Sequence, residues 1–153
     1  MKILMVCHGN ICRSPLADGL LRKKVKELNL PIEVDSAGTS NYHEGEAPDK
    51  RMTATAKKFG VDISFLRSRP ITREDLIVFD VIYVMDLENY WNVRSLCENK
   101  AQEEKVIPIL DLLYPNENRV VPDPYYGGEQ GFIDVFNLLD EATDKIVENF
   151  LKK

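Results

Sequence analysis

A short apolar segment runs directly into a tight loop and then a helix start, and this junction constrains the fold more than any other feature. Residues 3–6 read Ile-Leu-Met-Val, a buried-strand pattern, and residues 7–14 read Cys-His-Gly-Asn-Ile-Cys-Arg-Ser. Pro15 opens an apolar stripe at helical spacing, and Pro is well tolerated in a first helical turn. The segment therefore predicts a strand, a loop and a helix in immediate succession.

The rest of the chain alternates between strand and helix patterns. We expect strands at residues 2–6, 32–35, 78–84 and 105–109, helices at residues 15–28, 48–59, 86–98 and 132–150, a short capped helix near 72–76, and a long polar loop over 110–131. Apolar strands that alternate with helices indicate a parallel sheet covered on both faces. We therefore predict an α/β fold in one domain spanning residues 1–153, with ligands bound where the strands end.

Composition narrows the classes of partner and site. The 25 acidic against 20 basic residues give a net charge of −5, which argues against nucleic acid or an anionic membrane as partner. No segment reaches the ~18 apolar residues of a membrane span. Three cysteines at unrelated spacings favour a reducing cytoplasm over a disulfide framework, and with only two histidines no metal site is expected.

The 7–14 loop has the composition of an oxyanion site built around a nucleophile. The thiolate is the reactive form of cysteine, and a helix N-terminus with a nearby arginine stabilises the thiolate of Cys7. Inward N–H groups bind anions, and Gly9 and Asn10 tolerate the backbone conformations this requires. Arg13 presents a planar fork that can bind two phosphate oxygens. Ser14 can cap the helix or donate a hydrogen bond to the sulfur.

Each cysteine also has a structural alternative. Cys7 alone could be an inert buried side chain, although the spacing to Arg13 argues against that interpretation. Cys12 could form a reversible disulfide with Cys7 that shields it from over-oxidation, or it could be a small residue packed beneath the loop. Cys97 is expected in the core or on a helix surface.

A second segment, Asp-Pro-Tyr-Tyr at residues 123–126, supplies a candidate acid. A phosphate ester needs a proton donor for its leaving oxygen, and a protonated Asp123 over the pocket could provide it. The neighbouring tyrosines suit an aromatic substrate. The alternative is an ordinary Asp-Pro turn.

With both segments considered together, the chain resembles the low-molecular-weight protein tyrosine phosphatases over essentially its full length. The resemblance rests on the segments at residues 6–15, 35–39, 48–49, 85–86 and 123–126. It implies a four-stranded parallel sheet, doubly wound and flavodoxin-like, with helices on both faces.

The resemblance implies a two-step reaction without cofactor or metal. Cys7 attacks phosphorus and forms a phosphocysteine, while Arg13 and the loop amides stabilise the phosphoryl oxygens. Asp123 protonates the tyrosine oxygen and then acts as base for the hydrolytic water.

The resemblance also implies supporting roles. The phosphate-binding loop comprises Cys7, His8, Gly9, Asn10, Ile11, Cys12, Arg13 and Ser14. In the family, residues at the positions of Asn10, Ser14 and Ser36 brace this loop by hydrogen bonds, and residues at the positions of Tyr42 and Tyr125 line the slot for the phenyl ring. The redox role of Cys12 rests on the possible disulfide with Cys7 considered above. Tyr125 and Tyr126 match family tyrosines that can be phosphorylated.

Two positions depart from the family pattern. The residue after the nucleophile is usually aliphatic, and here it is His8, which either lines the mouth of the pocket or faces solvent without a role. Leu66 stands where many members carry a histidine that braces the loop through Asn10. Arg67 and Arg69 either place positive charge near the pocket or lie on a solvated surface.

The implied partners are phosphotyrosine-containing proteins, with inorganic phosphate and other oxyanions as inhibitors. We expect no nucleic acid or membrane partner, a monomer or weak dimer, and a cytoplasmic location.

Two other functions remain open. An arsenate reductase would use the same loop but needs further cysteines, and only Cys97 lies outside the loop. A non-catalytic phosphate-binding module would need neither the thiol nor the acid.

Overall fold

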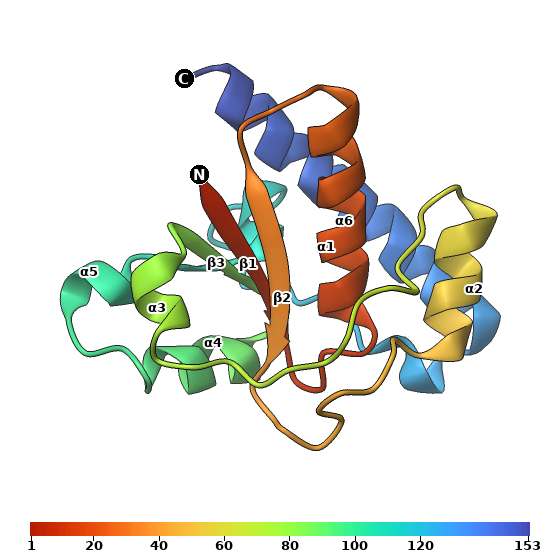
Figure 1. The fold of residues 1–153 in the computed structure, drawn as a ribbon, viewed down its shortest axis with the longest axis horizontal. Helices are drawn as coiled ribbons and strands as arrows, with labels where there is room; N and C mark the ends of the chain where they lie inside the picture. Colours follow the sequence, from red (N-terminus) through yellow and green to blue (C-terminus); the bar gives the residue numbers. More distant parts are fainter.

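Four parallel strands form a single sheet in this computed structural model, in the order β2-β1-β3-β4 (Figure 1). The structure describes residues 1–153 except for the side chain of Tyr126. The strands are β1 (Lys2–Cys7), β2 (Glu33–Gly38), β3 (Val81–Val84) and β4 (Val106–Pro108), and each neighbouring pair is parallel. The expected α/β architecture with a four-stranded parallel sheet is confirmed.

Helices cover both faces of the sheet (Figure 1). One side carries α1 (Arg13–Glu27), α2 (Lys50–Lys58) and the long α6 (Gly128–Leu151), and the other carries α3 (Asp75–Val78), α4 (Leu87–Arg94) and α5 (Lys100–Glu103). None of the helices in the described part of the chain is long and apolar enough to cross a bilayer.

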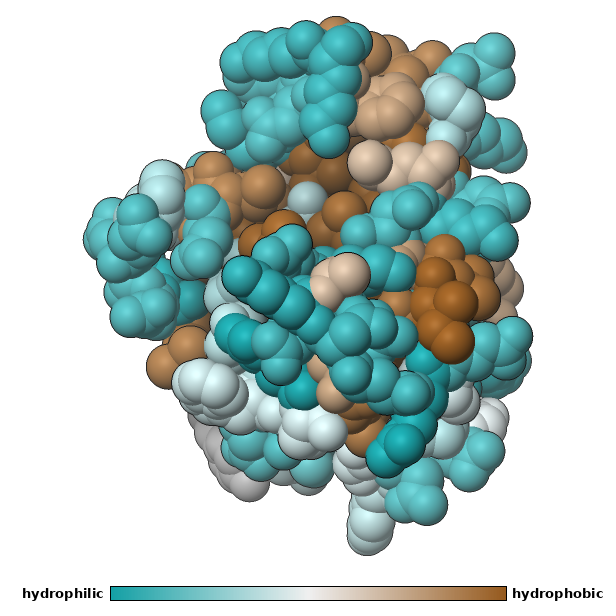
Figure 2. Space-filling model, turned by 90° about the vertical axis from the view of Figure 1, so that its left-hand side faces the viewer, coloured by the Kyte–Doolittle hydropathy of each residue, from teal (hydrophilic) through white to brown (hydrophobic). Residues whose placement is uncertain are grey.

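The central strand β1 divides the core into two clusters, because successive side chains of a strand point to opposite faces. Ile3 and Met5 belong to the larger cluster with the apolar stripes of α1 and α6. Leu4 and Val6 belong to the smaller cluster with residues of α3 and α4. On the outer surface over α3 to α5, hydrophobic residues lie in separate groups among hydrophilic ones (Figure 2).

Several boundaries differ from the sequence prediction. Helix α1 begins at Arg13, which places Pro15 third in the helix, where its missing N–H still needs no intrahelical acceptor. The segment after residue 35 is not a loop, because β2 continues to Gly38 in register with β1 up to Cys7. Val78 ends α3, so the predicted strand over 78–84 shortens to β3.

Helix boundaries in the C-terminal half also differ from the prediction. Helix α4 is shorter than predicted, because it ends at Arg94 and not at residue 98, whereas α5 is an additional helix that the sequence pattern did not predict. The expected loop over 110–131 contains two 3₁₀ helices, η1 (Ile109–Leu112) and η2 (Pro124–Tyr126), and the first turn of α6. Short elements like these lack the repeated apolar period on which a helix prediction depends.

The sheet places the loops that follow β1 and β2 at one end of the molecule, the lower end in Figure 1. The N–H of Thr39 donates to the carbonyl of Cys7 at 2.9 Å, and the N–H of Ser40 donates to the carbonyl of His8 at 3.0 Å. The loop after β2 therefore continues the ladder and supports the start of the 7–14 loop.

A buried carboxylate, Asp18, connects α1 to the sheet. Its side chain is completely buried, bonds to Arg22 at 2.9 Å and is hydrogen-bonded by Ser36 of β2. Desolvation by burial raises the pKa of Asp18 to about 6 from 3.8, against the opposing effect of Arg22. Because the folded state holds this proton more tightly than the unfolded chain, the contribution of Asp18 to stability falls as pH rises from 4 to 6.

We predict that Asp18→Asn removes this part of the pH dependence. The wild-type protein should lose about 1–3 kcal/mol of unfolding free energy relative to the variant between pH 4 and pH 7. Urea titrations at both pH values measure the difference. Asp134→Asn, at an exposed carboxylate on α6, serves as the control and should follow the wild-type profile. Parallel wild-type and Asp18→Asn profiles would contradict the assignment.

Candidate active site

A pocket of about 350 Å³ opens at the carboxyl ends of the strands. Three segments contribute to it: the 7–14 loop, the loop after β2, and the segment at the start of η2. The lining residues are Cys7, His8, Gly9, Ile11, Cys12, Arg13, Tyr42, His43, Asp123 and Tyr125. The structure thus brings together the predicted nucleophile, arginine, acid and aromatic walls.

Cys7 lies buried at the end of β1, and its sulfur has two hydrogen-bond partners. The N–H of Asn10 donates to Sγ at 3.3 Å, and Oγ of Ser14 lies 3.0 Å from Sγ. The side-chain amide of Asn10 donates to Oγ of Ser14 at 2.7 Å, which leaves the hydroxyl hydrogen of Ser14 to point at the sulfur. Donors aimed at the sulfur favour a thiolate over a thiol.

The same contacts decide between the two roles considered for Ser14. The residue at the N-cap of α1 is Cys12, and Ser14 lies inside the first turn of the helix. Ser14 therefore contacts the sulfur and does not cap α1.

Two backbone features shape the 7–14 loop. Asn10 has a φ of 57°, in the left-handed region that Asn tolerates better than most residues. A Cβ at Gly38 would lie 2.8 Å from the carbonyl oxygen of His8 and 3.1 Å from Cβ of Asn10. Only glycine at the end of β2 lets the loop pack this closely against the strand.

Arg13 is buried beneath the pocket and is fixed from one side. Its Nη1 donates to Oδ2 of Asp86 and to the carbonyl of Val121, both at 2.9 Å. Asp86 is itself held, because its Oδ1 accepts from the N–H of Asn89 as the N-cap of α4. With Nη1 engaged, the remaining donors of the guanidinium are available to an oxyanion in the pocket.

Cys12 has a different environment from Cys7. Burial, with the negative charges of Asp49 and Cys7 as smaller causes, raises the pKa of the Cys12 thiol well above its usual range. Cys12 is thus held as a neutral thiol, and the hydrogen-bond donors converge on Cys7. All three cysteines are free thiols in this structure, so the redox role of Cys12 remains a prediction.

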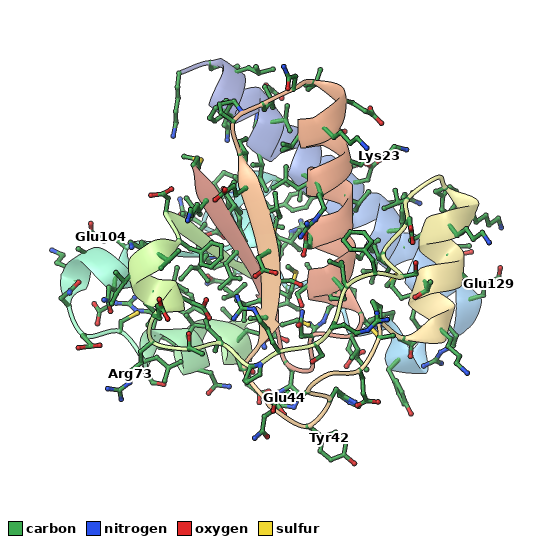
Figure 3. The ribbon with its side chains drawn as sticks, viewed as in Figure 1. Lys23, Tyr42, Glu44, Arg73, Glu104 and Glu129 are labelled. Carbon is green, nitrogen blue, oxygen red and sulfur yellow. The ribbon has the colours of Figure 1, made fainter. Side chains whose placement is uncertain are left out.

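Asp123 and two tyrosines form the mouth of the pocket. Oδ1 of Asp123 accepts from the N–H of Tyr125 at 3.0 Å, and the carboxyl group is exposed at the pocket rim. Tyr125 is half exposed, with the guanidinium of Arg51 4.9 Å from its ring centroid. Tyr42, 82% exposed, extends from the tip of the loop after β2 (Figure 3). The Tyr126 side chain lies outside the described residues.

His8 and His43 add titratable groups to this mouth. His8 is exposed and lines the pocket, as one of the two alternatives proposed. His43 was not expected: its Nδ1 lies 2.6 Å from Oε2 of Glu46, and its ring packs over Gly9.

The bracing of the 7–14 loop differs in part from the expectation. Oδ1 of Asn10 accepts from the N–H of Arg69 at 3.1 Å, and the hydroxyl of Ser68 donates to the carbonyl of Gly9 at 3.0 Å. Leu66 is buried in the core, and the segment at residues 68–69 supports the loop instead. Ser36 is buried in β2 and pairs with Asp18, with no contact to the loop among the hydrogen bonds of the described residues.

The two arginines of this segment do not line the pocket. Arg67 donates to the carbonyls of Ser64 and Leu66. Arg69 forms ion pairs with Asp35 at 3.1 Å and with Asp75 at 2.9 Å. Both guanidinium groups therefore stabilise the chain after α2, and neither residue belongs to the lining of the pocket.

Sequence reasoning missed the roles of three residues. Asp86 was noted only as part of a motif, although an acid directly after a buried strand lies at the end of the sheet where ligands bind. His43 and Ser68 carry no signal of their own, since their contacts depend on how two loops fold together. Within the described residues, no three His, Cys, Asp or Glu side chains gather as a metal site would require.

Comparison with known proteins places this site in a family. The family model for low molecular weight phosphotyrosine protein phosphatases matches residues 2–153. The chain belongs to this family. Its members are phosphatases, so the chain is placed among the hydrolases, as the motifs at residues 7–14 and 123–126 predicted.

Individual relatives and solved structures are similar to this protein over most or all of its length. A Synechocystis protein named among the low molecular weight protein-tyrosine-phosphatases is 41% identical over 155 residues, covering 100% of this chain and 98% of the relative. The human low molecular weight phosphotyrosine protein phosphatase is 37% identical over 88% of this chain and 86% of its own. A crystal structure of a protein tyrosine phosphatase from Entamoeba histolytica superposes with a TM-score of 0.92 at 37% identity, covering 99% of this chain and 97% of that chain.

We predict that Asp86→Asn weakens anion binding by releasing Arg13. Asparagine keeps an oxygen to cap α4 but turns an amide donor toward Nη1 of Arg13, which loses a charge-assisted hydrogen bond. The Kd for inorganic phosphate, measured by calorimetry, should rise about 10- to 100-fold. Asp134→Asn, at an exposed carboxylate on α6, is the matched control. An unchanged Kd in Asp86→Asn would contradict this role.

Proposed function

We propose that this protein hydrolyses phosphotyrosine through a phosphocysteine intermediate on Cys7. The observation that carries the proposal is the pair of hydrogen bonds to Sγ of Cys7, from Asn10 N–H and the Ser14 hydroxyl, at the base of a pocket that also holds Arg13 and Asp123. Hydrogen-bond donors that converge on a buried sulfur stabilise a negatively charged thiolate more than a neutral thiol, as a nucleophilic cysteine requires.

In the first step the Cys7 thiolate attacks phosphorus, a sulfur–phosphorus bond forms, and the bond to the tyrosine oxygen breaks. The leaving oxygen takes a proton from Asp123 and departs as tyrosine. The phosphoryl oxygens are stabilised by Arg13, whose position is set by Asp86 and Val121, and by the N–H groups of the loop.

In the second step water attacks the phosphocysteine. The Asp123 carboxylate accepts a proton from the water, the sulfur–phosphorus bond breaks, and inorganic phosphate is released. The Ser14 hydroxyl stabilises the departing thiolate through its 3.0 Å contact with Sγ. The enzyme ends the cycle with Cys7 as a thiolate and Asp123 protonated, ready for the next substrate.

The walls of the pocket favour an aryl ester as substrate. Tyr42 and Tyr125 line the mouth on which a phenyl ring would lie, and Arg51 packs over the Tyr125 ring. A buried sulfur also favours a long substrate, because phosphate on a tyrosine reaches deeper than phosphate on a serine. We propose phosphotyrosine-containing proteins as substrates and inorganic phosphate and other oxyanions as inhibitors, with the enzyme acting in the cytoplasm as a monomer or weak dimer.

Other chemistries on this fold receive less support. Cys97 packs against the smaller core cluster, and its thiol contacts the carbonyl of Val93. Arsenate reduction would need a further cysteine beside Cys7 to pass on a disulfide, and Cys97 does not line the pocket. One structural neighbour, at 28% identity and a TM-score of 0.90, is named Drosophila arginine phosphatase. Phosphoarginine therefore belongs among the substrates tested.

We predict that Cys7→Ser abolishes hydrolysis of p-nitrophenyl phosphate and phosphotyrosine peptides, because the hydroxyl is a far weaker nucleophile. Asp123→Asn should lower kcat by about 10²–10⁴-fold. Cys97→Ser, which changes a thiol outside the pocket, is the matched control and should keep wild-type turnover. Steady-state kinetics at a common pH measures all three.

The substrate class is tested in the same assay. Phosphotyrosine peptides should be hydrolysed in preference to matched phosphoserine and phosphoarginine peptides. Undiminished turnover in Cys7→Ser would contradict the mechanism, and a preference for phosphoarginine would contradict the proposed substrate.

A further inference from the structure

A second groove, of about 300 Å³, opens directly beside the catalytic pocket. Its lining residues are His8, Arg13, Asp86, Glu88, Val120, Val121, Pro122 and Asp123. His8, Arg13 and Asp123 also line the catalytic pocket, so the two cavities lie side by side and share these three residues. A peptide whose phosphotyrosine fills the first cavity would place a neighbouring side chain in or near the second.

The groove combines an apolar wall with unbalanced negative charge. Val120 and Pro122 are exposed and supply the apolar wall. The carboxylate of Asp86 is balanced by Arg13, at 2.9 Å. Glu88 is exposed and forms no ion pair with any described residue. Its negative charge is therefore available to interact with a molecule bound in the groove.

Bound substrate makes the groove more negative. A phosphoryl dianion and the Cys7 thiolate outweigh the single charge of Arg13, and Asp123 adds a further negative charge whenever it is ionised. His8 is the one other titratable group lining the groove in the described part of the chain, and only its protonated form would oppose a cation. The groove with substrate bound therefore favours a positively charged occupant.

We propose that this groove binds a lysine or arginine side chain of the substrate protein close to its phosphotyrosine. Such a side chain fits both halves of the groove, since its methylene stem packs on Val120 and Pro122 while its head reaches Glu88. The proposal rests on the proposed function and adds a sequence preference to it. The groove lies on the α4 side of the pocket, opposite the basic helix α2, so an acidic residue of the substrate is disfavoured there.

The test compares phosphotyrosine peptides that differ at one position. A parent peptide with alanine at three positions on each side of the phosphotyrosine is substituted singly with lysine or glutamate. The readout is the ratio of kcat/KM for the lysine peptide to that for the glutamate peptide. At the best position the wild-type enzyme should favour lysine about 3- to 10-fold, as expected for one partly exposed ion pair gained and one repulsion avoided.

Variants at Glu88 locate the preference. Glu88→Gln should bring the ratio close to one, and Glu88→Lys should invert it in favour of glutamate. Glu104→Gln is the matched control, because it makes the same change in charge at the C-terminal end of α5, far from the loop that carries Tyr42 (Figure 3), and should keep the wild-type ratio. Using a ratio within each variant removes any effect on folding or on the chemical step.

The outcomes separate this proposal from the proposed function. If wild-type enzyme hydrolyses phosphotyrosine peptides but shows no lysine preference, or shows one that Glu88→Lys does not change, the groove assignment is overturned and the phosphatase function stands. If no phosphotyrosine peptide is hydrolysed while Cys7-dependent turnover of another phosphate ester persists, the proposed function fails first.

Discussion

The buried guanidinium of Arg13 ties together the parts of the molecule on which the site depends. It lies in the first turn of α1, pairs with Asp86 after β3, and donates to Val121 in the segment that leads to Asp123. A buried charge is costly unless it is paired and hydrogen-bonded, so these contacts hold three distant segments at fixed positions. The contacts of Arg13 therefore fix the start of α1, the end of β3 and the segment before Asp123 relative to one another.

A second constraint is the close packing of the 7–14 loop against its neighbours. The loop packs so closely against β2 that there is no room for a side chain at position 38. The side-chain amide of Asn10 donates a hydrogen bond to Ser14 and accepts one from the backbone N–H of Arg69. Leu66, at the position where many family members carry a histidine, is buried in the core, and Ser68 and Arg69 brace the loop.

Local patterns predicted much of the fold, because the relevant physics is local. The apolar run before Cys7, the glycine-containing loop and the amphipathic α1 each specify their own conformation, and their order implies a parallel sheet. The short elements η1, η2 and α5 were missed, since their few residues show no period. The end of β2 was misplaced because Ser36 and Gly38 enter the sheet by pairing with β1, and not by their own strand propensity.

The sequence by itself determined the chemistry of the site: which residue types follow the first strand, and that an acid and tyrosines occur later in the chain. Only the tertiary structure decided how these act together. In the folded protein, Ser14 contacts the sulfur of Cys7, whereas Cys12 is a buried neutral thiol. Asp86 accepts a hydrogen bond from Arg13 and holds its guanidinium in place. The tertiary structure also placed Glu88 beside the pocket. These outcomes depend on burial and on contacts between residues far apart in the chain, which no local pattern encodes.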